Sequence, residues 1–169
     1  LQTLGLGVCW LGLGRMHPKT APQVSGMQFV ILLFGGMDVY ESLCVSFATA
    51  GTGGFSIWPD NMMSYGGVTN YEFCTWVIAI FMFLFSINFN VYFLIITGKV
   101  ASALLSEELH WFIGTVVTAT ALITANIYEA YGNLSDALMH GFFQVSTIIS
   151  TTGYATTDFN LWPNTSKMI

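Results

Sequence analysis

Long runs of residues without Asp, Glu, Lys or Arg dominate the pattern along the chain. The longest covers residues 73–98, which as a helix would reach roughly 39 Å at about 1.5 Å per residue. The hydrocarbon core of a bilayer is about 30 Å thick, so this run is long enough to cross it with some tilt. Residues 109–128 form another apolar run that is long enough to cross once. The pattern therefore predicts a transmembrane helix over each range.

Two other uncharged runs, residues 42–59 and 137–157, begin like apolar helices but change character before they could complete a crossing. Each passes into a stretch of Thr, Ser and Gly, which a full-span helix does not usually contain at mid-depth. Irregular backbone at that depth is tolerated only where protein or a water-filled cavity surrounds it. We therefore predict that each run forms a re-entrant half-helix followed by an extended loop.

The N-terminal part is less regular. Residues 20–36 can form one helix, although Pro22 and Ser25 make its first half weakly apolar. Residues 1–14 are apolar and rich in glycine, which suits either the end of a preceding crossing or a divergent segment. Because the chain opens at Leu1 rather than at Met, we expect it to begin inside a longer reading frame.

Composition narrows the class of protein. Hydrophobic residues make up 54% of the 169 residues and charged residues only 8%, whereas about 25% of a soluble domain is charged. So few ionic groups argue against a soluble enzyme, a disordered chain and a nucleic-acid binder. No grouping of His, Cys, Asp and Glu has metal-ligand spacing, and the three cysteines (Cys9, Cys44, Cys74) form no C-x-x-C pair. We expect an integral membrane protein that is not an enzyme and has no cofactor.

An internal repeat relates the two loops that are rich in Thr and Gly. Residues 52–56 (TGGFS) align with residues 151–155 (TTGYA) at an offset of 99 residues. Acidic residues open each half-helix, namely Asp38 and Glu41 in the first and Asp136 in the second. The repeating unit is therefore helix, half-helix, loop, helix, which predicts an all-α membrane protein of potassium-channel-like architecture.

The repeat also divides the chain. We assign residues 20–99 to one complete unit and residues 100–169 to a second unit whose last helix is truncated. Residues 1–19 remain a segment of uncertain structure.

The repeated unit suits the coordination of a dehydrated monovalent cation. A potassium-type filter replaces the water shell of the ion with backbone carbonyls, and glycine permits the backbone conformation that this requires. Threonine hydroxyls can extend the same ladder of oxygens. The carbonyl end of a half-helix is the negative end of its dipole and favours a cation.

At these residues the chain resembles the Trk/Ktr/HKT superfamily of potassium transporters, and within it the bacterial TrkH-like integral subunit. The resemblance rests on AGTGGFSI (50–57), SINFN (86–90), SEELHWFIG (106–114) and FFQVSTIISTTGYATTDFNLWP (142–163). In that family four repeats of helix, pore half-helix and helix (M1–P–M2) surround one pore. The resemblance implies that this chain holds the second repeat and a truncated third.

The resemblance also implies the site and the setting. The filter loops would hold K⁺ at Thr52, Gly53, Gly54, Thr151, Thr152 and Gly153, with Phe55 and Tyr154 completing them. Members of the family are multi-pass proteins of the bacterial inner membrane, in contact with lipid. They form homodimers and are gated by cytoplasmic nucleotide-binding regulatory subunits. The first and fourth filter loops of the family are absent from this sequence.

Several polar residues within or beside the apolar runs have two readings each. Asn88 and Asn90 either tie their helix to a neighbouring half-helix or contact the ion, because an unsatisfied amide would be costly there. His140 is either a packed neutral imidazole or a proton sensor, and His110 is expected at the membrane interface.

Loop charge suggests an orientation. If the half-helices enter from outside, residues 99–108 are cytoplasmic and Lys99 obeys the positive-inside rule. Seven acidic residues then lie outside, where they would either attract cations or simply mark helix ends. These are Asp38, Glu41, Asp60, Glu72, Glu129, Asp136 and Asp158.

The sequence thus predicts potassium permeation as part of a Trk-type uptake system. A non-transporting membrane remnant of a truncated transporter gene is the alternative. The sequence does not distinguish strict K⁺ selectivity from mixed K⁺/Na⁺ selectivity. It also does not distinguish channel-like transport from symport with another ion.

Overall fold

The computed structural model describes residues 21–58, 61–62, 65, 70–87, 91–92, 94, 98 and 105–157. Its helices are α2 (Ala21–Phe34), α3 (Val39–Ala50), α4 (Tyr71–Ser86), α7 (Glu107–Tyr131) and α8 (Leu134–Ile149). The described residues contain no strand, which confirms the predicted all-α fold. The predictions for residues 1–19 and for the truncated last helix lie outside the described residues.

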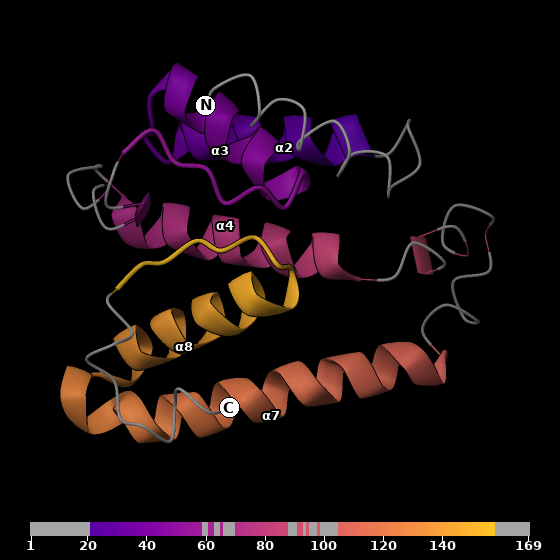
Figure 1. Ribbon diagram of the computed structural model, residues 1–169, viewed down its shortest axis with the longest axis vertical. Coiled ribbons are helices and arrows are strands. Elements are labelled where there is room, and N and C mark those ends of the chain that lie inside the picture. The colour runs from indigo at the N-terminus through magenta and orange to yellow at the C-terminus, as the bar shows by residue number, and fades with distance from the viewer. Residues whose placement is uncertain are drawn as a thin grey trace.

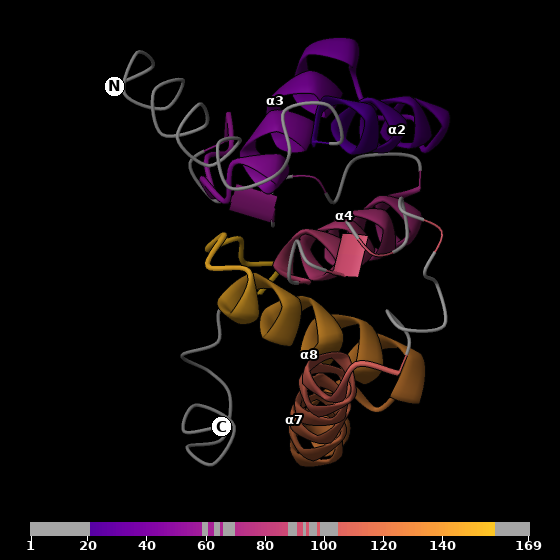
Figure 2. The same ribbon diagram turned by 90° about the vertical axis from the view of Figure 1, so that its right-hand side faces the viewer.

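α4 is the central element of the structure. It lies between the pair α2 and α3 on one side and the pair α8 and α7 on the other (Figure 1, Figure 2). Aromatic side chains join it to the second unit, since the rings of Trp76 and Phe142 stack with centroids 5.7 Å apart. The rings of Phe83 of α4 and Phe112 of α7 also stack, with centroids 5.5 Å apart. Side chains of the second unit therefore pack directly against α4 of the first.

A helix followed by an extended loop is present at each of the two predicted places. Asp38 caps α3, because its carboxylate accepts a hydrogen bond of 3.2 Å from the backbone N–H of Tyr40. α3 then ends at Ala50 and α8 ends at Ile149, so the two helices stop 99 residues apart, as the repeat predicts. α8 begins about one turn earlier than an offset of 99 residues from the start of α3 would place it. The two helices therefore correspond best at their C-terminal ends, where the loops begin.

The prediction of one continuous helix over residues 73–98 is wrong in extent. α4 ends at Ser86, and Ile87 is extended, with φ −66° and ψ 137°. Polar side chains stabilise this end: the Ser86 hydroxyl donates to the Met82 carbonyl at 2.8 Å, and the Tyr92 hydroxyl donates to the Leu84 carbonyl. A tally of charged residues carries no signal for this break, because Ser86 and Ile87 are both uncharged.

The lengths of the helices bear on the membrane prediction. Among the described residues, the stretch Glu107–Tyr128 alone is long and apolar enough to span a bilayer, as predicted for 109–128. The apolar stretches Pro22–Phe34 and Tyr71–Ser86 are shorter. With 16 residues, α4 reaches only about 24 Å. Helical backbone is found again at Val91 and Tyr92.

The α7–α8 interface depends on a glycine. A Cβ atom on Gly141 would lie 2.8 Å from the hydroxyl oxygen of Thr124 on α7. We expect Gly141→Leu to lower the free energy of unfolding by about 2 kcal/mol, because overpacking forces the two helices apart. Thermal unfolding of the purified protein in detergent measures this.

Gly114 on α7 is the matched control, since a Cβ there meets nothing within 4 Å. Gly114→Leu should raise stability slightly or leave it within about 0.5 kcal/mol, because leucine favours the helix over glycine. Equal destabilisation by both substitutions would contradict this account of the interface.

Candidate functional site

The two predicted loops, residues 51–58 and 150–157, leave their helices by the same backbone path. Three hydrogen bonds of 2.8–3.2 Å close each helix end, and the donors and acceptors of one loop match those of the other at an offset of 99 residues. In the first loop Gly51, Thr52 and Gly53 donate to Phe47, Thr49 and Ala48; in the second, Ser150, Thr151 and Thr152 donate to Ser146, Ile148 and Thr147. This is the Schellman pattern that ends many helices. The repeat seen in the sequence is therefore also a repeat of conformation.

Left-handed backbone recurs at the same places in both loops. Thr52 has φ 49° and Thr151 has φ 56°, and the following glycines, Gly54 and Gly153, have φ 62° and 85°. A β-branched residue at positive φ is an outlier that costs roughly 1–2 kcal/mol. Such strain persists only where the surrounding structure holds it, and it is typical of binding sites.

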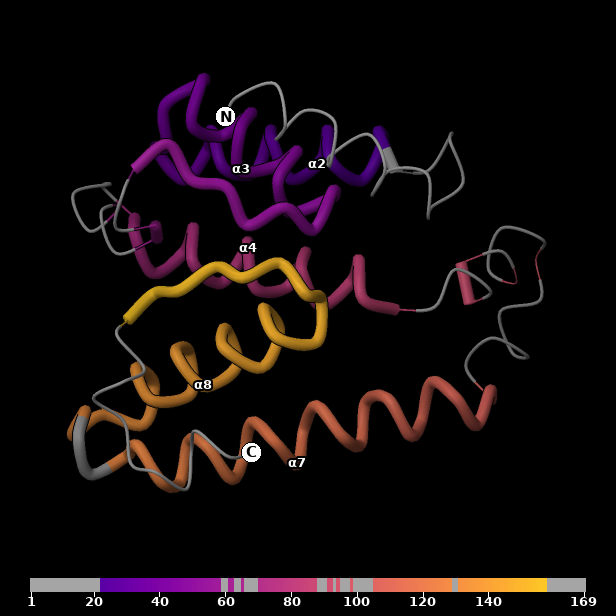
Figure 3. Tube along the Cα trace, viewed as in Figure 1, coloured from indigo at the N-terminus to yellow at the C-terminus, as the bar shows by residue number. Residues whose placement is uncertain are grey.

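The two loops also touch each other. The hydroxyl of Tyr154 donates a hydrogen bond of 3.2 Å to the carbonyl of Phe55, its own counterpart in the repeat. Gly54 lies against the backbone of Thr152, so closely that an added Cβ would be 2.0 Å from the Thr152 carbonyl oxygen. The loops accordingly run side by side between α3 and α8 (Figure 1, Figure 3).

The predicted site residues are not equally enclosed. Thr152 and Tyr154 are buried, with 4% and 1% of their surfaces exposed. Thr52, Gly53 and Gly54 are half-buried, whereas Thr151, Gly153 and the ring of Phe55 are exposed. The structure thus brings Gly54, Phe55, Thr152 and Tyr154 together, and it leaves Thr151 and Gly153 on an open side of the pair of loops.

Side chains at one equivalent position of each half-helix hold the outer parts of the loops. Glu41 of α3 accepts a hydrogen bond of 3.0 Å from the indole N–H of Trp58. His140, 99 residues later, has its Nδ1 atom 2.9 Å from the hydroxyl of Thr156 and stacks on Tyr131 with ring centroids 5.0 Å apart. The predicted packing of His140 is confirmed, and its role as a proton sensor stays a hypothesis.

The acidic residues that open the half-helices have structural partners. The carboxylate of Asp136 accepts a hydrogen bond of 3.2 Å from the side-chain amide of Asn133, and Asp38 is the N-cap of α3. For these two residues and for Glu41, the contacts match the simpler reading that they fix helix and loop ends. Asp60, Asp158, Asn88 and Asn90 lie outside the described residues.

Sequence reasoning missed Gln28 of α2. Its side chain is fully buried, and its amide nitrogen donates a hydrogen bond of 3.2 Å to the hydroxyl of Thr49. Thr49 lies two residues before the first loop begins. Its hydroxyl in turn donates a hydrogen bond of 2.7 Å to the Val45 carbonyl. Burying an amide without a hydrogen-bond partner is costly. A glutamine in an apolar helix therefore indicates a buried hydrogen bond already in the sequence.

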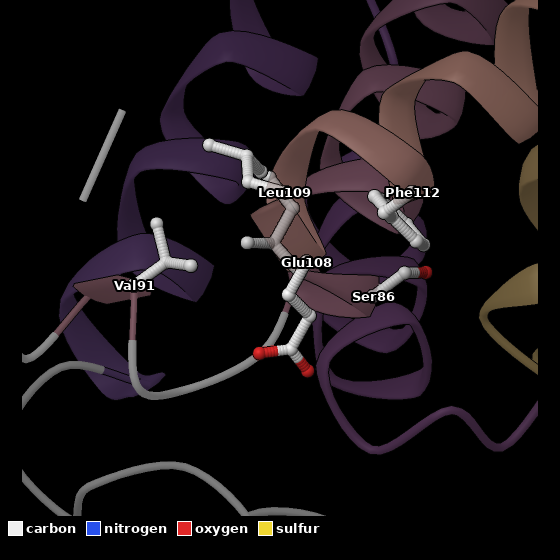
Figure 4. A pocket seen from close by; sticks show the side chains of 6 residues that line it. Ser86, Val91, Glu108, Leu109 and Phe112 are labelled. Carbon is white, nitrogen blue, oxygen red and sulfur yellow. The ribbon is translucent and has the colours of Figure 1, made fainter. Parts of the chain in front are cut away.

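A small cavity lies apart from the loops, where the end of α4 meets the start of α7 (Figure 4). It measures about 140 Å³ and is lined by Ser86, Ile87, Val91, Glu108, Leu109 and Phe112. Neither loop contributes to it. In the part of the chain that the structure describes, no three His, Cys, Asp or Glu side chains are grouped so that they could hold a metal ion.

Comparison with known proteins identifies relatives of this arrangement. No protein-family model matches the chain. The potassium uptake protein TrkH of Escherichia coli strain K12 is 27% identical over an alignment of 162 residues, and the match covers 88% of this chain and 33% of TrkH. TrkG of the same strain is 28% identical over an alignment of 134 residues, and the match covers 76% of this chain and 26% of TrkG. The chain therefore spans about a third of the length of the curated relatives that it matches.

A solved structure with a similar fold is also a Trk protein. The crystal structure of the potassium transporter TrkH from Vibrio parahaemolyticus superimposes with a TM-score of 0.75 and 22% identity, covering 94% of this chain and 38% of that one. In sequence the chain is therefore similar to the potassium uptake proteins TrkH and TrkG, and in fold it is similar to TrkH.

Proposed function

We propose that this chain forms part of the K⁺ pathway of a Trk-type uptake protein, with residues 51–58 and 150–157 as two walls of one selectivity filter. The observation that carries the proposal is the repeated geometry of the loops. Left-handed backbone recurs at Thr52 and Thr151 and at Gly54 and Gly153. The loops meet at the hydrogen bond between Tyr154 and Phe55.

The chemistry of these loops suits the ion. Oxygen ligands from backbone carbonyls and threonine hydroxyls can replace the water shell of K⁺ without any charged ligand. We assign this role to the backbone of Thr52, Gly53, Gly54, Thr151, Thr152 and Gly153, of which all but the buried Thr152 are exposed or half-buried. The C-terminal ends of α3 and α8 add the negative ends of two helix dipoles.

The setting follows from the relatives and from the helices. We infer a multi-pass protein of the bacterial inner membrane, in which α7 crosses once and α4 belongs to a broken crossing. Broken helices are tolerated within a membrane where they line a cavity or are buried in protein. Homodimer formation and a cytoplasmic nucleotide-binding regulatory subunit are proposals that rest on the resemblance to the TrkH-like subunits. We also propose symport with another ion on the basis of that resemblance.

Uptake in living cells tests the proposed function. The full reading frame that encodes this chain is expressed in a bacterial strain that lacks its own potassium uptake systems. We expect growth at low external K⁺ and uptake of K⁺ in preference to Na⁺. Normal amounts of protein in the membrane without any K⁺ uptake would contradict the proposal and favour the reading as a non-transporting remnant.

A further inference from the structure

One side chain joins the two loops across the repeat. The Tyr154 hydroxyl belongs to the second loop and donates its hydrogen bond to the Phe55 carbonyl in the first. The ring of Tyr154 lies in the core that α2, α3 and α4 of the first unit build around Leu32 and Val45. Tyr154 is therefore fixed at both its ring and its hydroxyl, and through it the second loop is attached to the first unit.

Only the second loop supplies a side-chain hydroxyl for this connection. Phe55 occupies the equivalent position in the first loop, but it has no hydroxyl, and 52% of its surface is exposed. The repeat therefore holds one donor where a symmetrical arrangement would hold two. Replacing Tyr154 removes the hydroxyl that joins one repeat position to the other.

A close backbone approach lies beside this hydrogen bond. Gly54 packs on the Thr152 carbonyl at a distance that no Cβ atom would allow. Thr152 is itself held, since its hydroxyl oxygen lies 2.6 Å from that of Ser150 at the end of α8. The spacing between the loops is thus set at two neighbouring points, by a hydrogen bond at Tyr154 and by the absence of a side chain at Gly54.

This spacing matters for ion choice. Na⁺ is smaller than K⁺, so a ring of carbonyls whose walls resist closing around the smaller ion favours K⁺. We propose that Tyr154 is a specificity-determining positioning residue, whose hydrogen bond to the Phe55 carbonyl holds the two loops at the separation that K⁺ requires. The inference rests on the proposed function of these loops as filter walls. Tyr154 acts here through the backbone of Phe55.

The test is Tyr154→Phe, which keeps the buried ring and removes only the hydroxyl. Uptake of Rb⁺ as a K⁺ substitute, with increasing Na⁺ as competitor, gives the selectivity ratio in cells that express the full reading frame. A hydrogen bond of this kind contributes a net stabilisation equivalent to a factor of about two to ten. We expect the ratio of K⁺ to Na⁺ uptake to fall by about that factor, with Rb⁺ uptake in the absence of Na⁺ changed less.

Tyr131→Phe is the matched control. It removes the same group from a tyrosine that donates a hydrogen bond of 3.2 Å to the Thr157 hydroxyl, within one repeat. The control should leave the selectivity ratio unchanged. Because the ratio does not depend on the amount of protein, a lower level of either variant in the membrane does not obscure the comparison.

The outcomes are distinguishable. An unchanged ratio in Tyr154→Phe, together with a lowered ratio in Gly54→Ser, would overturn the role of Tyr154 and leave the proposed filter intact. Equal losses in Tyr154→Phe and Tyr131→Phe would also overturn it, since general loop stability would then explain both. Loss of all uptake in Tyr154→Phe would do the same. Unchanged ratios in both Tyr154→Phe and Gly54→Ser would contradict the filter itself.

Discussion

Serine in place of Gly54 is expected to remove most of the preference of uptake for K⁺ over Na⁺. Gly54 has φ +62°, and a Cβ atom there would lie 2.0 Å from the Thr152 carbonyl oxygen. Because that neighbour is backbone, the side chain can be accommodated only if one of the loops moves. A displacement that costs the K⁺ site about 1.4 kcal/mol relative to Na⁺ lowers the ratio tenfold. Competition between Rb⁺ and Na⁺ in whole cells should therefore show a loss of roughly tenfold or more.

Gly53 provides the control within the same loop. A Cβ on Gly53 would come closest to the exposed ring of Phe55, at 3.0 Å, and that ring can rotate away, while the Ala48 carbonyl oxygen lies at an ordinary contact distance of 3.8 Å. Gly53 also lacks the positive φ of its neighbour. Gly53→Ser should thus disturb selectivity much less than Gly54→Ser. A preference for K⁺ that survives Gly54→Ser would remove Gly54 from the proposed filter.

Gly153→Ser should impair selectivity in the same direction but by a smaller factor. Gly153 has φ +85°, a conformation that serine adopts only with strain, yet a Cβ there meets nothing within 4 Å. The expected effect therefore comes from backbone strain alone, roughly 1–2 kcal/mol. If a shift of the loop relieves that strain and about 0.7–1.4 kcal/mol of it appears as lost preference for K⁺, the uptake ratio falls by about three- to tenfold.

Gly132 provides the control that distinguishes backbone strain in the loop 150–157 from backbone strain elsewhere in the second unit. It has φ +70° with nothing within 4 Å of an added Cβ, and it lies in the turn between α7 and α8. Gly132→Ser should lower thermal stability by an amount similar to Gly153→Ser while leaving the uptake ratio unchanged. Equal loss of selectivity in both variants would show that strain anywhere in the second unit produces the effect.

Much of the fold could be predicted from local pattern. The change from an apolar run to Thr and Gly located the ends of α3 and α8, because those residue types end helices and tolerate left-handed backbone. The break after Ser86 could not be predicted by the same method. Hydrophobicity decides whether a segment enters a membrane, but it does not fix where a helix within that segment ends, and α4 ends at Ser86 with Ile87 extended.

The candidate site was predictable in its residues but not in its contacts. The offset of 99 residues identified the two loops, yet it gave no indication that Tyr154 would reach the carbonyl of Phe55. Similarly, nothing in the pattern pairs Glu41 with Trp58 or Gln28 with Thr49. Such pairs join elements that are distant in sequence, and hydrophobic periodicity reports only which face of an element is buried.

The coupling between Gly54 and Gly153 tests most directly whether the two loops are walls of one filter. The ratio of K⁺ to Na⁺ uptake is measured for Gly54→Ser, Gly153→Ser and the double variant. Two sites that coordinate one shared ion should be coupled, so the double variant should depart from the sum of the single effects by about 0.5 kcal/mol or more. Additivity within that margin would contradict the account, as would full selectivity in Gly153→Ser beside its loss in Gly54→Ser.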